Sequence, residues 1–143
     1  MRKHSPLLLD THIWIWLMDG VADKISVPLR ARISDAAGQG LVYISAISVW
    51  EVAILDQLKK LTLSVECRTW VDRALEAPGV QFAPLTPAIM IDSTRLPGEP
   101  HRDPADRMLI ATARSLNGTL VTRDRLILEY SVGGYVKTLS AER

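Results

Sequence analysis

Short apolar runs alternate along this chain with longer stretches in which apolar residues recur every three or four positions. The short runs are typical of buried strands, and the wider spacing is typical of amphipathic helices. We expect strands over residues 6–10, 41–44, 80–83 and 119–122, with a short edge strand over 135–137. Helices are expected between them, over 13–17, 27–37, 46–58, 65–76, from residue 87 onward, 104–116 and 125–130.

Residues at the expected helix ends support these boundaries. Ser45, Thr86 and Asp103 are N-cap types, and a proline follows the last two at the first helical position. The pair Asn117-Gly118 suits a helix end. Strands that alternate with helices favour a parallel sheet covered on both faces. We therefore predict one α/β domain over residues 1–143, with a central parallel sheet of four to five strands flanked by helices.

The composition of the chain excludes only a few classes of protein. The 143 residues are 48% hydrophobic, enough for one core, and the single cysteine, Cys67, cannot form an internal disulfide, which fits a cytoplasmic location. No apolar run has the length of a membrane span, and no secretory signal is expected. The net charge of +1, from 17 basic and 16 acidic residues, lacks the basic excess common in nucleic-acid-binding proteins.

Four acidic residues fall where an α/β sheet places its ligands. Asp10 follows the first expected strand and Asp124 the fourth, while Glu51 and Asp106 lie in the first two turns of expected helices. Ligands of open α/β sheets bind beyond the carboxyl ends of the strands, so these side chains are expected to converge there. Crowded carboxylates repel unless a cation neutralises them, and oxygen ligands of this kind suit Mg²⁺ or Mn²⁺.

Each acid also has a structural explanation that the sequence leaves open. Asp10 could simply end a strand, and Glu51 could face solvent. Asp106 could stabilise the start of its helix, and Asp124 could cap the helix that follows it. The three histidines, at positions 4, 12 and 101, are scattered, and no cysteine–histidine spacing indicates zinc.

Four segments around these acids resemble the PIN-domain family, specifically the VapC-type toxins of bacterial toxin–antitoxin pairs. The segments are Leu8–Trp14, Ile44–Glu51, His101–Ala113 and Leu120–Asp124. The most specific stretches are Asp-Thr-His in the first segment and His-Arg-Asp-Pro-Ala-Asp-Arg in the third. Together the segments span nearly the whole chain.

The resemblance implies a metal-dependent endoribonuclease in which Asp10, Glu51, Asp106 and Asp124 hold Mg²⁺ or Mn²⁺. It also implies a homodimer and a VapB-like antitoxin that blocks the site. Supporting residues would be Thr11, Ser48, Asp103 and Thr122. A capping or core role explains Ser48 and Thr122 equally well. For Asp103 we prefer the role of N-cap over a direct role at the metal.

The substrate of such an enzyme would be RNA, but the sequence does not say which. The residues that could guide it are Arg102, Arg107, Arg123, Arg125, Trp14 and Trp16. The tryptophans could instead contact a partner, because helices 13–17 and 46–58 could form an apolar groove for an antitoxin helix.

Two other function classes compete with a nuclease. A haloacid-dehalogenase-type phosphatase also begins with an aspartate after a strand, but it needs a second aspartate where this chain has His12. A non-catalytic RNA- or protein-binding module would not need all four acids.

Overall fold

A computed structural model of the chain describes residues 5–141. Its strands are β1 (Leu7–Leu9), β2 (Val42–Ser45), β3 (Val80–Ala83), β4 (Thr119–Thr122) and β5 (Lys137–Ser140). Its helices are α1 (Thr11–Met18), α2 (Val27–Gly38), α3 (Ala46–Gln57), α4 (Cys67–Leu75), α5 (Pro87–Ser93), α6 (Pro104–Leu116) and α7 (Arg125–Ser131), with a 3₁₀ turn η1 (Ala22–Lys24).

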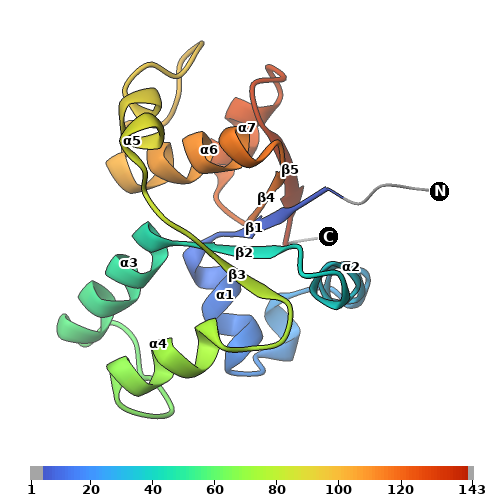
Figure 1. Cartoon of the computed structure of the whole chain (residues 1–143), viewed down its shortest axis with the longest axis vertical. Helices are drawn as coiled ribbons and strands as arrows, with labels where there is room; N and C mark the ends of the chain where they lie inside the picture. Colours follow the sequence, from blue (N-terminus) through green and yellow to red (C-terminus); the bar gives the residue numbers. More distant parts are fainter. Residues whose placement is uncertain (1–4, 142–143) are drawn as a thin grey trace.

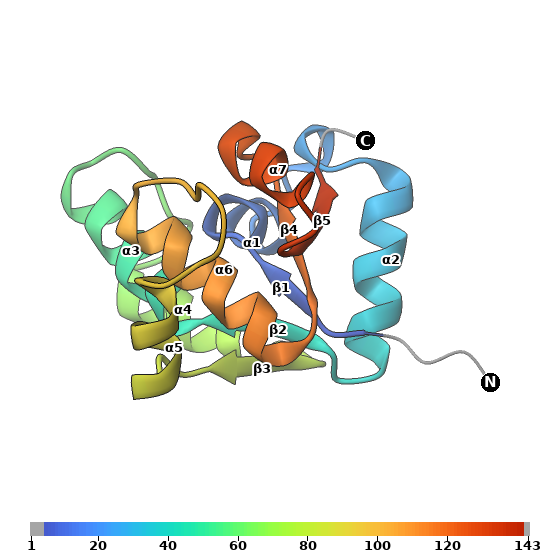
Figure 2. The same cartoon turned by 90° about the horizontal axis from the view of Figure 1, so that it is seen from above.

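The strands form one five-stranded sheet in the order β3-β2-β1-β4-β5, with every neighbouring pair parallel. β1 lies at the centre, where Leu8 is in register with Tyr43 of β2 and Leu120 of β4. Helices cover both sides of the sheet (Figures 1 and 2). The predicted α/β architecture with a parallel sheet is confirmed.

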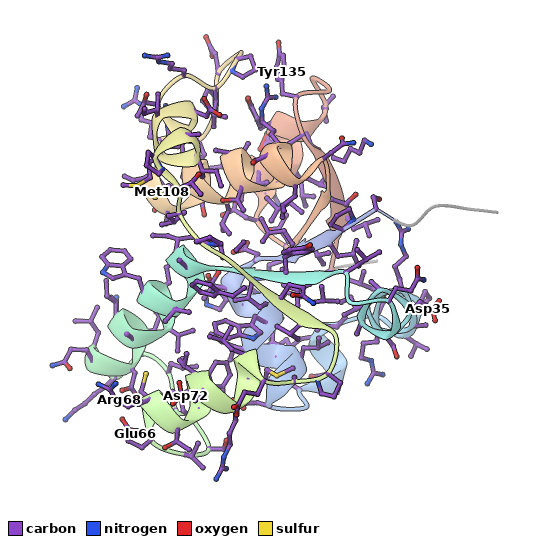
Figure 3. All side chains as sticks on the ribbon, viewed as in Figure 1. Asp35, Glu66, Arg68, Asp72, Met108 and Tyr135 are labelled. Carbon is purple, nitrogen blue, oxygen red and sulfur yellow. The ribbon has the colours of Figure 1, made fainter. Side chains whose placement is uncertain are left out.

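The alternation of side chains along β1 divides the core into two layers. Leu7 and Leu9 pack in a cluster with residues of α1, α2, α3 and α4, while Leu8 packs on the opposite face against α6 and α7. All three leucines are buried, as expected for a strand covered on both faces. Polar side chains such as Asp35 on α2 and Asp72 on α4 project away from this core (Figure 3).

Three elements, α1, α4 and β5, begin two residues away from their expected first residue. The expected edge strand over 135–137 begins only at Lys137, because its partner β4 begins at Thr119, which is in register with Lys137. The first helix begins at Thr11, two residues earlier than expected, because Asp10 caps it. None of the helices formed by residues 5–141 is long and apolar enough to cross a membrane.

Candidate active site

The four acids come from four elements that meet at the carboxyl edge of the sheet. Asp10 is the N-cap of α1, directly after β1, and Asp124 is the N-cap of α7, two residues after β4 ends. Glu51 lies on α3, which follows β2 without a gap, and Asp106 lies in the first turn of α6. Helices α3 and α6 begin at the same end of the molecule in both views (Figures 1 and 2).

Asp10 and Glu51, the inner pair, are held by a network of buried hydroxyls. The Thr122 hydroxyl donates to Asp10 Oδ2 at 2.6 Å, and the Thr11 backbone N–H donates to Asp10 Oδ1 at 2.7 Å. The Thr11 hydroxyl donates to Glu51 Oε1 at 2.5 Å and lies 2.9 Å from the Ser48 hydroxyl. Thr11, Ser48 and Thr122 are almost fully buried, so the hydroxyl side of these contacts is shielded from water, whereas Asp10 and Glu51 are partly exposed.

Asp106 and Asp124, the outer pair, are held mainly by helix starts. Asp124 Oδ1 accepts the backbone N–H groups of residues 126 and 127, and its own N–H donates to the Thr122 hydroxyl at 3.0 Å. Asp103 caps α6 by accepting the Asp106 N–H at 3.1 Å, as its expected N-cap role requires. Asp106 Oδ2 lies 3.3 Å from His101 Nε2.

The pKa shifts show that the acids share one electrostatic environment. Burial, reinforced by the charges of Asp10, Asp103, Asp124 and Glu51, raises the pKa of Asp106 to about 8. Burial also raises the pKa of Asp10, against the lowering effect of the Thr122 and Thr11 hydrogen bonds. The pKa of Glu51 is raised by burial, although the Thr11 hydroxyl opposes the shift. Without a cation, the cluster therefore retains protons that solvated carboxylates would lose.

This donor set fits a divalent cation. Oxygen atoms of Asp106 and Asp124 and a ring nitrogen of His101 all lie within 4.8 Å of one another. Each carboxylate oxygen has two lone pairs, so the hydrogen bonds to Asp10 and Glu51 leave acceptor capacity for a metal. A site dominated by carboxylate oxygens favours Mg²⁺ or Mn²⁺ over zinc.

Cationic and aromatic side chains gather on α1 and at the end of β4. The Arg123 guanidinium lies over the Trp16 ring at 4.8 Å from its centroid, and Lys24 Nζ lies 5.7 Å from it. The rings of His12 and Trp16 are 5.9 Å apart. This group borders the acids, because Arg123 stands between Thr122 and Asp124 and the His12 charge lowers the pKa of Asp10.

The other residues expected to guide RNA have different surroundings. Arg102 and Arg125 are exposed. Arg107 Nε donates to the His101 carbonyl at 2.7 Å, a contact that fixes the loop before α6. Trp14 is fully buried and packs edge-on against Trp70, with centroids 5.0 Å apart. The expectation that Trp14 contacts RNA or a partner was wrong, because its ring belongs to the core.

One residue at the site was missed. The sequence alone indicated no role for His101, one of three scattered histidines, but in the structure its ring lies against Asp106. The available signal was its position two residues before Asp103 in the segment His-Arg-Asp-Pro-Ala-Asp-Arg.

The parallel sheet and the acids grouped at its carboxyl edge define an α/β domain of the PIN-like class. The family model for the PIN domain matches residues 7–132, and the chain belongs to this family. The chain is 31% identical over 126 residues to ribonuclease VapC22 of Mycobacterium tuberculosis, and the match covers 85% of this chain and 88% of that protein.

Solved structures show the same fold at lower sequence identity. VapBC2 from Rickettsia felis, bound to a DNA fragment from its promoter, gives a TM-score of 0.66 at 14% identity, covering 94% of this chain and 97% of that one. DNA-bound VapBC from Salmonella typhimurium gives a TM-score of 0.65 at 16% identity, covering 95% and 98%. FitAcB from Neisseria gonorrhoeae gives a TM-score of 0.63 at 20% identity, covering 96% of this chain and 99% of that one.

Proposed function

We propose that this PIN-domain protein is a metal-dependent endoribonuclease, the VapC-type toxin of a toxin–antitoxin pair. The observation that carries the proposal is that Asp106 is partly buried within reach of the charges of Asp10, Asp124 and Glu51. Burial first, and then these charges and that of Asp103, raise the pKa of Asp106 to about 8. Holding unneutralised carboxylates this close is costly, and a bound cation would offset that cost. The relative named ribonuclease VapC22 supports RNA as the substrate.

In this proposal the four acids hold Mg²⁺ or Mn²⁺. When bound, the cation supplies activation of water and neutralisation of charge on the phosphodiester. The hydroxyls of Thr11 and Thr122 fix the oxygens of the inner pair, so that both carboxylates are oriented before a ligand arrives. Asp124 combines two roles, because its Oδ1 caps α7 while its Oδ2 makes no hydrogen bond within residues 5–141.

RNA would approach over the side of the acids where Arg123 lies on Trp16. Arginine and lysine there would neutralise backbone phosphates, and the flat guanidinium–indole surface suits an unstacked base. Arg102, on the loop before α6, is exposed and would contact a further phosphate. Arg107 is less suited to bind a phosphate, because its Nε already donates to the His101 carbonyl.

We also propose a VapB-like antitoxin partner and a homodimer. The structural neighbours VapBC2 and VapBC, named as pairs, support the antitoxin. Large apolar side chains are exposed at Trp50 on α3, at Leu58, which caps the end of α3, and at Met90 and Ile91 on α5. Both helices lie at one end of the molecule (Figures 1 and 2), which suits a protein interface. Molar mass measured alone and after coexpression with the product of the adjoining reading frame tests both assemblies.

The nuclease proposal is tested by cleavage of total RNA in the presence and absence of metal. We expect no cleavage in excess chelator and recovery on addition of Mg²⁺ or Mn²⁺. Metal should also raise the melting temperature, since it binds only the folded state. Mapping the cleaved ends would identify the RNA substrate. We expect the enzyme to act on this RNA in the cytoplasm. Full activity in excess chelator would exclude this mechanism and leave a metal-independent enzyme or a contaminating nuclease.

The second candidate is a PIN-like module that binds RNA or protein without cutting. The presence of all four acids in one environment argues against it. RNA binding without cleavage under every metal tested would favour the module.

A further inference from the structure

We propose that His101 is a positioning residue: it presents a fixed N–H to Asp106 and so orients this carboxylate for the metal. The inference rests on the proposed function, because it concerns how one ligand of that site is held. It adds a residue that neither the acidic quartet nor its supporting hydroxyls include.

Three contacts fix His101 in place. The Asp103 backbone N–H donates to His101 Nδ1 at 3.0 Å, and Arg107 Nε donates to the His101 carbonyl at 2.7 Å. The third contact is the 3.3 Å approach of Nε2 to Asp106 Oδ2. The contacts from residues 103 and 107 come from the start of α6, so the ring moves as one unit with the helix that carries Asp106.

The contact at Nδ1 determines where the ring proton lies. A nitrogen that accepts a hydrogen bond from a backbone N–H carries no proton of its own. The proton of the neutral ring is therefore on Nε2, the atom that faces Asp106. The N–H at His101 Nε2 therefore donates toward the Asp106 carboxylate. The Thr122 and Thr11 hydroxyls donate to the inner pair in the same way.

The same contact argues against His101 as a metal ligand. Ligation requires a bare nitrogen, and Nε2 could become bare only if the proton moved to Nδ1, where it would oppose the Asp103 N–H. A direct contact with RNA is the competing role. His101 also lines an open cavity of about 490 Å³ together with Arg102, Leu126 and Tyr130, so its other side is accessible.

Two conservative variants separate the ring's two hydrogen bonds. His101→Gln keeps a donor at the Nε2 position, whereas His101→Asn keeps an acceptor at the Nδ1 position and is too short to reach Asp106. His101→Ala removes both. Mn²⁺ affinity is measured by calorimetry, and RNA cleavage is measured as a function of Mn²⁺ concentration. Melting temperatures in chelator show whether each variant is folded.

We expect His101→Asn and His101→Ala to weaken Mn²⁺ binding by about 10- to 100-fold, the range found when outer-sphere partners of metal ligands are removed. His101→Gln should stay within a few-fold of wild type. At saturating Mn²⁺ all three variants should regain most of the wild-type cleavage rate. Long-range ¹⁵N–¹H spectra of the wild type should show the His101 proton on Nε2.

Several results would overturn the inference. One is normal Mn²⁺ affinity in all three variants, and another is a Gln variant as weak as the Ala variant. A cleavage rate that stays low at saturating Mn²⁺ with unchanged affinity would assign His101 to the substrate instead. A wild type that binds no Mn²⁺ would contradict the proposed function and this inference together, whereas the other results contradict the inference alone.

Discussion

The two pairs of acids share one site but are held by different means. Asp10 and Glu51 depend on side-chain hydroxyls contributed by β4 and α1. Asp124 is held by backbone N–H groups at the start of α7, and Asp106 by its place in the first turn of α6 and by His101. The inner pair is therefore sensitive to single substitutions that remove a hydroxyl, whereas the backbone contacts of the outer pair survive most side-chain changes.

The largest effect is expected from the inner pair itself. Asp10→Asn keeps an oxygen for the Thr11 N–H, and the Thr122 hydroxyl can rotate to accept from the new amide. The fold should remain, and metal-free stability should be equal or higher because one charge is removed from a repelling cluster. Cleavage should fall by about a thousandfold or more, the scale of losing a principal electrostatic group. Cleavage rates of purified protein check this, and activity within a few-fold of wild type would contradict the role of Asp10.

A smaller effect is expected when the hydroxyl network is broken and the acids remain. Thr11→Val removes the donor to Glu51 Oε1 and the contact with Ser48. Cleavage at limiting metal should fall by about 10- to 100-fold, and stability by about 1–3 kcal/mol, because a buried polar group loses its partner. Thr11→Ser is the matched control and should stay close to wild type. Equal losses in both variants would mean that the methyl group matters, not the hydroxyl.

The smallest effect is a pH dependence that belongs to the outer pair. The pKa of Asp106 is about 8 in the folded, metal-free protein, against an ordinary value of 3.8. Between these values the unfolded chain has lost the proton and the folded protein keeps it, so stability falls as pH rises. The shift corresponds to roughly 4 kcal/mol between about pH 5 and pH 8. Because solvent screens this partly exposed carboxylate, denaturation in chelator should show a loss of about 2 kcal/mol over this range. In Asp106→Asn the slope should flatten; an unchanged slope would assign it to other groups.

The parts of the structure that depend on local chemistry could be predicted from the sequence. The N-caps at Ser45, Thr86 and Asp103 are where their residue types indicated, because capping needs only neighbouring backbone. The strand order required more than local patterns, and the sequence indicated only that the sheet is parallel. That the four acids share one environment could be expected, since parallel strands end at one edge.

The errors arose where long-range packing decides the outcome. Trp14 lies in an apolar stretch whose periodicity does not distinguish a core position from an exposed one, and contact with Trp70 on α4 buries it. The position of His101 near Asp103 in the sequence was the one signal, but its contact with Asp106 depends on the path of the loop before α6. The edge strand was placed too early because its start depends on pairing with β4, where Lys137 is in register with Thr119.

The central position of β1 has a consequence for the order of events during synthesis. Asp10 is made before its partner Thr122, which lies 112 positions later in the chain. β1 can acquire its second neighbour only when β4 has left the ribosome, and the outer acid Asp124 emerges last of the four. Such distant pairings form slowly, after most of the chain is available. A growing chain therefore cannot assemble the four acids into one site before β4 and Asp124 have been made.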